Sequence, residues 1–535
     1  MMSVVRRAAW RDGSDNGWHE DFVWYAAAIH QMRARTEGLD DFLEIFSEAL
    51  AQDFPQQLVV QLVTIARTWS DPRSLGYQSQ VHGTFVPKQL WPQQQGQPAL
   101  WQECAHNHWF FLPWHRAYLI EFETVVREHI RQLGGPADEW ALPYWNYSDH
   151  ADDPRRLGLP LPLRGATLPD GVEVPGVQAL DDGTFPNPLF NPTRLGPDEP
   201  DPGDDTEWAT ATIALLRPHY ANQEDTGFVS FGGGVLEDPD NAALFHDSAR
   251  ELGQMDAQPH GSVHVHVHGT MALFETAGLD PVFWIHHCNV DRLWETYARE
   301  LQHGYPFQNG VGTGTVAQQS WTDRQFRFRR GDGSTGTWSA PEVLDVESLG
   351  YGYDTIAPPP LPEVPPPPPA GSENAPFGVA TSTPEPVASA GPVSLVREEH
   401  LAVSSGAGGD QGLGVDSFPG NARWLLRFDG IRSSRPAPTS YRVYLGLQPD
   451  QAADPQDADH YAGLLTLFGV YEASRTDGSS ATSGQSRRLD VTAQVAAQAA
   501  TFRPLATSVR LVPLDPGRRL ADAEVSIDRL SLEFA

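Results

Sequence analysis

The spacing of hydrophobic residues differs between the two ends of the chain. Before residue 357, the clearest apolar patterns repeat every three or four positions, which is the spacing of an amphipathic helix. The segments that show it are 22–35 (FVWYAAAIHQMRAR), 40–52 (DDFLEIFSEALAQ) and 115–133 (HRAYLIEFETVVREHIRQL). Residues 150–245 are rich in Pro, Gly and Asp and are expected to form mostly loops. This part of the chain is predicted to be a mainly α-helical domain, built as a helix bundle.

Near the C-terminus, apolar and polar residues alternate, as they do in half-buried β-strands. The alternating runs are 423–431 (RWLLRFDGI), 440–448 (SYRVYLGLQ), 508–514 (SVRLVPL) and 525–535 (VSIDRLSLEFA). Several short strands separated by turn-rich sequence predict an antiparallel β-sandwich or barrel.

A proline-rich segment separates the two patterns. Residues 357–378 read APPPLPEVPPPPPAGSENAPFG, and polar, Pro-containing sequence continues to about 392. Such a run cannot build a hydrophobic core, so we expect a stiff spacer that proteases can reach. The predicted organisation is a helical domain over 1–356, a linker over 357–392 and a β-rich domain over 393–535.

Composition narrows the class of protein. The chain has 535 residues, 40% hydrophobic and 20% charged, which is ordinary for a soluble protein. A formal net charge of −32 argues against nucleic acid or an anionic membrane as a partner, because both attract basic surfaces. There is no apolar run of about 18 residues that would span a membrane. The first residues, MMSVVRRAAW, lack the apolar stretch of a signal peptide, so we expect a cytoplasmic location, with export bound to a partner left open.

Six histidines stand out because they fall into two sets of three. They are His82 in VHGTF, His106 and His115 in CAHNHWFFLPWHR, His260 and His264 in PHGSVH, and His287 in DPVFWIHHCNVDRLW. Imidazole ligands suit copper, and two equivalent sets without carboxylate or thiolate ligands indicate a matched metal pair. The pattern predicts two copper ions that bind dioxygen between them.

The spacing within each set agrees with this interpretation. His260 and His264 are four residues apart, so on a helix they share one face. Pro113 is expected to lie near the start of a helix that carries His115, while His106 comes from the preceding segment.

Two features near the second set leave alternatives: which of two neighbouring histidines faces the metal, and whether the segment is a helix or a strand. His286 and His287 are neighbours about 100° apart on a helix, so one of them is expected to face away from a given metal. The alternating His264, His266 and His268 would suit a strand that binds a single metal ion, whereas Pro259 favours a helix that starts near His260.

These motifs resemble the type 3 copper proteins: tyrosinases, catechol oxidases (polyphenol oxidases) and haemocyanins. The resemblance implies that His82, His106 and His115 bind one copper ion, that the second set binds the other, and that His286 is not a ligand. A Cys-x-His in this place forms a thioether bond in some members, so a Cys104–His106 crosslink is expected; the alternative is a buried free thiol.

MALFETAGLDPVFW is similar to a segment of the plant enzymes. By that similarity, Phe274 is expected to stand over the metal pair as a gate and Phe283 to pack against ligand imidazoles, although each could be ordinary core packing. LGYGYD (349–354) looks like the tyrosine motif that closes the catalytic domain.

YAGLLTLF (461–468), SVRLVPL (508–514) and VSIDRLSLEF (525–534) resemble the domain that covers the copper site in plant polyphenol oxidases. In those enzymes, the covering domain keeps the enzyme latent until it is displaced or cut off. We therefore expect an intramolecular inhibitor and an activating protease.

The chain departs from the family at two places. Gly261 stands where many strong monophenol hydroxylases have Asn, and the water-holding Glu of the family is matched by Asp256, with Glu251 as an alternative. If that pair deprotonates the incoming phenol, its weakening makes oxidation of o-diphenols to o-quinones by O2 the safer expectation than ortho-hydroxylation of monophenols. The rival interpretations are a haemocyanin-like oxygen carrier and a storage protein with degenerate copper sites.

Overall fold

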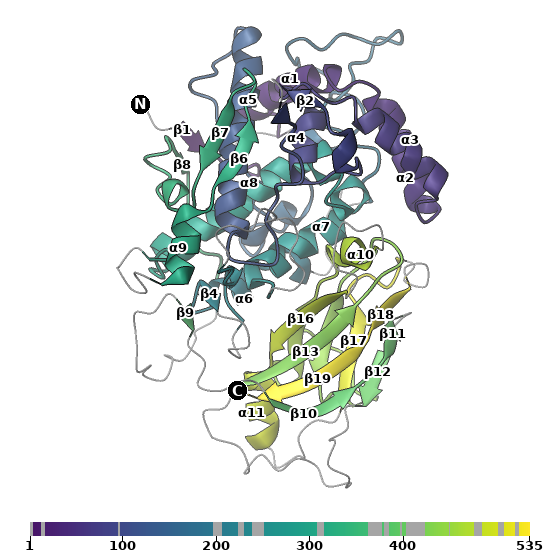
Figure 1. Ribbon diagram of the computed structural model, residues 1–535, viewed down its shortest axis with the longest axis vertical. Coiled ribbons are helices and arrows are strands. Elements are labelled where there is room, and N and C mark those ends of the chain that lie inside the picture. The colour runs from purple at the N-terminus through teal and green to yellow at the C-terminus, as the bar shows by residue number, and fades with distance from the viewer. Residues whose placement is uncertain are drawn as a thin grey trace.

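Helices occupy the first two thirds of the chain and antiparallel strands the last third (Figure 1). The computed structural model describes residues 4–11, 17–94, 97–195, 206–222, 229–237, 251–307, 315–361, 377–378, 385–395, 399–402, 423–448, 450–475, 484–500, 508–518 and 524–534. Within these ranges, no helix is both long and apolar enough to cross a membrane.

The helical domain is organised around two long buried helices. α5 (Phe111–Gln132) packs against both α1 (Glu20–Ala34) and α8 (Pro281–Glu295). Every residue of α8 is buried, and the ring of Phe122 on α5 stacks parallel to Trp284 on α8. The other helices of this domain are α2 (Leu39–Ala51), α3 (Gln56–Ala66), α4 (Leu75–His82), α6 (Thr212–Leu215), α7 (Ser262–Val267) and α9 (Val316–Asp323).

Strands in the helical domain are short. β1 (Val4–Arg6) pairs in parallel with β8 (Tyr351–Tyr353), and β6 (Phe326–Arg329) forms a hairpin with β7 (Thr335–Trp338). The remaining two-residue strands are β2 (Gln93–Gln94), β3 (Gln97–Pro98), β4 (Ala221–Asn222), β5 (Gly233–Gly234) and β9 (Phe377–Gly378). Within the described parts of 150–237, α6, β4, β5 and a few single helical turns occur, as the loop prediction implied.

The C-terminal domain is a β-sandwich, and its sheets do not close into a barrel. The strand orders of its two four-stranded sheets are β10-β19-β13-β16 and β12-β17-β14-β15, and the pair β11-β18 lies beside them. The strands are β10 (Glu385–Ala390), β11 (Val393–Leu395), β12 (Glu399–Ala402), β13 (Trp424–Ile431), β14 (Tyr441–Leu445), β15 (Tyr461–Leu465), β16 (Gln485–Asp490), β17 (Ser508–Pro513), β18 (Val525–Ile527) and β19 (Arg529–Phe534).

Two short helices complete the sandwich. α11 (Thr492–Ala500) follows β16, and α10 (Val470–Ser474) lies at the end of the sandwich that faces the helical domain (Figure 1). The inward-facing residues of both sheets form one separate core that includes Leu426, Phe428, Val443 and Leu511. The expected combination of a helical domain and a β-sandwich is confirmed.

One boundary differs from the sequence prediction. Most of the predicted linker lies outside the described residues, but β10 falls inside it, so the sandwich begins before residue 393. Pro386 hid this strand, because proline lacks the N–H that a central strand needs. β10 is an edge strand with an irregular register between Pro386 and Ala388, which is where proline is tolerated.

A buried network of charges ties the N-terminus and the tyrosine motif to α8. Asp291 accepts hydrogen bonds from Arg6 (3.1 Å), Arg116 (2.5 Å), Tyr351 (2.8 Å) and Tyr353 (2.5 Å). Burial alone would raise the pKa of Asp291, but Arg116 and Arg6 hold it below its usual value. Asp291 therefore holds the side chains of Arg6 and Arg116.

This network predicts a large loss of stability when its central charge is removed. Asp291→Asn leaves two buried guanidinium groups without their full counter-charge, so the free energy of unfolding should fall by about 3–5 kcal/mol. The measurement is urea unfolding of the full-length protein followed by circular dichroism. Asp138→Asn is the control, because Asp138 and its partner Arg131 are 89% and 58% exposed, respectively. A loss above about 1 kcal/mol in Asp138→Asn, or no loss in Asp291→Asn, would contradict the stabilising role of the buried network.

Candidate metal centre

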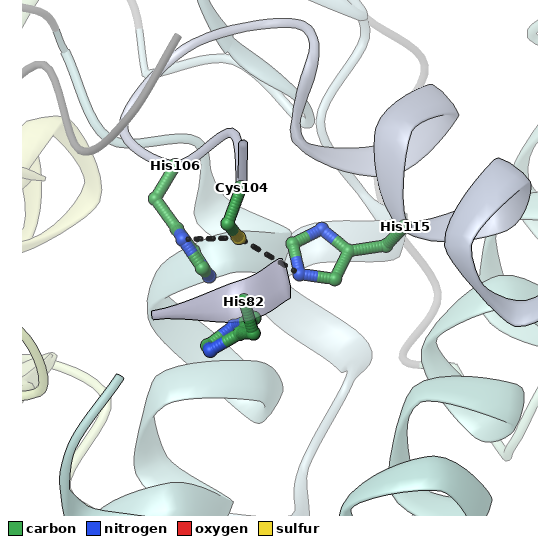
Figure 2. Close-up of side chains that lie close together, drawn as sticks. All are labelled: His82, Cys104, His106 and His115. Carbon is green, nitrogen blue, oxygen red and sulfur yellow. Dashed lines mark hydrogen bonds between the residues drawn. The ribbon is translucent and has the colours of Figure 1, made fainter. Parts of the chain in front are cut away.

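Three histidines of the first set converge from separate elements. His82 is the last residue of α4, His106 lies in the loop before α5, and His115 lies near the start of α5. Their nitrogens and the sulfur of Cys104 all lie within 4.8 Å of one another, and all four side chains are buried. Figure 2 shows the rings grouped around a common point, with Cys104 between His106 and His115.

Local sequence explains these positions. The Ser74 hydroxyl accepts a hydrogen bond from the Tyr77 N–H (3.0 Å) and so caps α4, which ends at His82. α5 starts at Phe111 with Pro113 in its first turn, as expected, which leaves His106 in the preceding loop.

The second set converges in the same way. His260 lies in the irregular helical turn η6 (Asp256–Gly261), His264 in α7 and His287 in α8. Their nitrogens, together with one of His286, lie within 4.8 Å of one another. α8 begins where the Asp280 carboxylate accepts the Val282 N–H (2.9 Å) and Pro281 opens the helix.

The second set is helical, and the alternative reading of a strand is wrong. His264 and His266 both belong to α7, and the backbone of His268, with φ of 57°, ends that helix. The ring of His266 stacks on Trp208 with centroids 4.1 Å apart instead of joining the cluster.

Backbone carbonyls fix the orientation of four rings. The Nδ1 atoms lie at hydrogen-bond distance from carbonyl oxygens: His82 from Phe274 (2.9 Å), His115 from Phe111 (2.8 Å), His260 from Asp256 (3.0 Å) and His264 from Met271 (2.7 Å). Because a carbonyl only accepts, each Nδ1 carries the hydrogen and each Nε2 keeps its lone pair.

The free nitrogens fit a metal ion. Nε2 of His260, His264 and His287 is buried and has no hydrogen-bond partner among the described residues. Burial lowers the pKa of His82 to about 3 and lowers those of His115, His264 and His287 well below the usual value. At neutral pH these rings are uncharged, which is the form that binds a metal.

The two sets form one centre. The rings of His115 and His287 stack with centroids 4.5 Å apart and an interplanar angle of 7°. His106 and His260 face each other at 5.3 Å and 27°. Six imidazoles from six elements therefore line two adjacent positions, as a metal pair requires.

Two other expected site residues lie at the centre. The buried Cys104 sulfur is 3.2 Å from His106 Nδ1 and 3.5 Å from His115 Nε2. Phe283 packs against His287 (4.3 Å between centroids) and His82 (4.9 Å).

Asp256 is also at the centre, and Glu251 is not. A carboxylate oxygen of Asp256 lies 3.1 Å from His260 Nδ1, whereas Glu251 binds Asn222 and Arg488. Gly261, next to His260, lies close to the C-terminal domain: a Cβ atom there would stand 3.3 Å from Cβ of Phe468.

Phe468, which follows β15 in the sandwich, is the residue that sequence reasoning missed. Its ring stacks on His264 with centroids 4.1 Å apart and an angle of 16°, and it contacts Phe274 at 4.6 Å. Phe274 in turn stacks on His106 at 4.8 Å and 23°. Phe468 ends the YAGLLTLF run, but a phenylalanine after a strand has the pattern of an ordinary core residue, so nothing in the sequence marked it.

Polar contacts hold the sandwich against the metal centre. Glu472 on α10 accepts the backbone N–H of Phe274 (3.0 Å), and Arg475 pairs with Glu275 (2.6 Å). Arg518 donates to the carbonyls of Val265 (3.2 Å) and His266 (2.8 Å). Hydrogen bonds and an ion pair thus join the C-terminal domain to the segments that carry Phe274 and His264.

Comparisons with known proteins agree with the geometry. Residues 72–300 match the sequence family described as the common central domain of tyrosinase, and residues 400–534 match a domain of unknown function. Tyrosinase HcTyr1 of Hahella sp. (strain CCB-MM4) is 27% identical over 87% of this chain and 93% of its own length. The chloroplastic (+)-larreatricin hydroxylase of Larrea tridentata is 25% identical over 54% of this chain and 44% of its own length, so the chain spans less than half of that relative.

Solved structures share the fold over the whole chain. A latent aurone synthase (polyphenol oxidase) aligns with a TM-score of 0.54 and 17% identity, covering 100% of this chain and 89% of its own. Latent apple tyrosinase aligns with a TM-score of 0.53 and 20% identity, covering 100% and 98%. The chain is therefore a homologue of the tyrosinases and polyphenol oxidases, which are copper-dependent oxidoreductases, and it has the two-domain fold of their latent forms.

The contacts of His286 and His287 predict different effects on copper content. His287 has no hydrogen-bond partner among the described residues at either nitrogen, whereas His286 lacks one only at Nε2, since its Nδ1 lies 3.0 Å from the hydroxyl of Tyr147. His287→Ala should therefore lose one of the two copper ions, and His286→Ala should keep both. Elemental analysis of copper-loaded, full-length protein measures this. Equal losses in the two variants would show that His286 is a ligand.

Proposed function

We propose that this protein is a latent dicopper phenol oxidase, which oxidises o-diphenols to o-quinones with O2. The observation that carries the proposal is the pairing of two buried three-histidine sets with an aromatic plug, Phe468, stacked over one of them. An oxygen carrier is the less favoured alternative, because the relatives found are named as tyrosinases and polyphenol oxidases.

The histidines would hold the metal pair through the nitrogens that face one another. His82, His106 and His115 would bind one copper ion, and His260, His264 and His287 the other. When bound, the pair supplies the redox chemistry that couples the oxidation of a diphenol to the reduction of O2. The protein contributes neutral, oriented ligands and an apolar wall that excludes bulk water, formed by Phe274 and Phe283.

Phe468 marks where the substrate ring would lie. Its parallel stack on His264 is the contact that a phenol could make, with Phe274 at its edge. The covering domain would therefore inhibit by occupying the substrate position, and displacement or proteolysis in the 357–392 segment would open it.

Diphenols are proposed as the main substrates, with ortho-hydroxylation of monophenols as a weaker activity. Gly261 offers no amide at the position where strong hydroxylases have Asn. Both carboxylate oxygens of Asp256 are engaged within the protein, at His260 Nδ1 (3.1 Å) and at the Asn107 N–H (2.9 Å). The Cys104–His106 thioether is also proposed, since the sulfur already touches the ring.

This function is tested by comparing protein in which Phe468 covers His264 with protein that lacks this contact. Copper-loaded protein truncated after about residue 360 should oxidise a small catechol, and full-length Phe468→Ala should be at least about tenfold faster than the full-length wild type, since a buried aromatic ring is worth roughly 1.5–3 kcal/mol. The monophenol matching that catechol should react more slowly. The assay follows quinone absorbance.

Phe185→Ala provides the control, because Phe185 is exposed and belongs to neither the metal centre nor the plug. Truncated and full-length wild type of equal speed would contradict latency. Reversible O2 uptake without quinone formation would favour the carrier.

Latency should weaken as the pH rises. Burial, followed by the neighbouring Glu275, raises the pKa of Glu472 to about 8, and the Phe274 N–H and Arg475 oppose this effect only in part. In the undocked domain, the pKa of this carboxyl should return to about 4.3. Docking therefore takes up a proton, is strongest below the undocked pKa, and is lost progressively as the pH rises through the docked one.

The ratio of full-length to truncated activity should accordingly increase from about pH 5 to about pH 8. Taking the ratio cancels the pH dependence of the catalytic step itself. Glu472→Gln keeps an acceptor for the Phe274 N–H but cannot ionise, so its ratio should be flat by comparison. A ratio that falls with pH, or the same slope in Glu472→Gln, would refute the role of this carboxyl.

A further inference from the structure

The carboxylate of Asp256 contacts both histidine sets. One oxygen, Oδ1, lies 3.1 Å from Nδ1 of His260 in the second set. The other, Oδ2, accepts the backbone N–H of Asn107 (2.9 Å), the residue that follows His106 in the first set. Asp256 is 3% exposed, so water does not screen these contacts.

On the side of the second set, the carboxylate acts on a ligand ring. His260 Nδ1 lies 3.0 Å from the Asp256 carbonyl as well as 3.1 Å from its side chain, so its hydrogen is shared by two acceptors of one residue. A charged acceptor on the far nitrogen fixes the ring and makes the free nitrogen a stronger donor to a metal.

On the side of the first set, the carboxylate holds a left-handed turn. Asn107 has φ of 63°, in the left-handed region, which asparagine adopts more readily than most L-residues. The hydrogen bond from its N–H to Asp256 stabilises this turn, and the turn places His106. His106, Asp256 and His260 offer ligand atoms that all lie within 4.8 Å of one another.

We infer that Asp256 is a positioning residue that sets the spacing of the two copper ions, by holding His260 and the His106–Asn107 turn with one carboxylate. This role rests on the proposed function, since it assumes that both sets bind copper. This role differs from that of a carboxylate that holds a water molecule for an incoming phenol, because both oxygens of Asp256 already contact groups that position the histidine ligands.

The experiment uses full-length, copper-loaded protein and two readouts: copper per chain, and the share of Cu(II) that is visible by electron paramagnetic resonance. Two Cu(II) ions coupled through a shared bridge give no signal, whereas separated ions do. In Asp256→Asn, the amide oxygen can still accept one of the two N–H groups, but the amide NH2 is a donor and cannot accept the other. We expect copper affinity to fall about 10–100-fold and most of the remaining copper to become visible.

Two further variants sharpen the result. Asp256→Glu keeps the charge and can still reach both donors, so it should lie between Asp256→Asn and the wild type; it also carries the test should Asp256→Asn fail to fold. Asp457→Asn is the matched control, because Asp457 holds the His460 ring (2.8 Å) within the sandwich and should leave both readouts unchanged.

Each remaining outcome is decisive. Asp256→Asn with wild-type affinity and silent copper overturns the inference. Loss of one ion per chain while the other keeps its wild-type affinity also overturns it, since Asp256 would then serve a single set. A wild type that does not bind a coupled pair refutes the proposed function itself, which the variants alone would not.

Discussion

Four backbone carbonyls determine what this protein can bind. By taking the Nδ1 hydrogen of His82, His115, His260 and His264, they leave one lone pair on each ring, at Nε2. Burial lowers the pKa of His82, His115 and His264 and so keeps these rings neutral. A buried, uncharged cluster of nitrogen lone pairs is unfavourable without a ligand that accepts them. The helices around it are arranged so that a pair of metal ions meets this need.

The segment at Phe274 connects this metal centre to its regulation. The Phe274 carbonyl orients His82, its ring lies on His106, and its backbone N–H binds Glu472 of the covering domain. Phe468 then fills the space between Phe274 and His264. Undocking the sandwich would therefore remove Phe468 from His264 and free the Phe274 N–H from Glu472 in one step.

The sequence was most informative where chemistry and spacing are local. The His260–His264 pair on one helix, the helix start near Pro113 and the alternating strands of the sandwich all follow from short-range patterns, and the structure contains them. Three features could not be read in this way. Phe468 and the Asp256–Asn107 contact join residues far apart in the chain, and β10 was concealed by a proline that only an edge strand accepts.

Six imidazoles are expected to hold two copper ions side by side beneath Phe468. Crystals of the copper-loaded, full-length protein, with diffraction recorded on both sides of the copper absorption edge, would test this arrangement directly. We predict two anomalous peaks close together, one within bonding distance of His82, His106 and His115 and the other of His260, His264 and His287. A single peak, or peaks bound by other side chains, would contradict it.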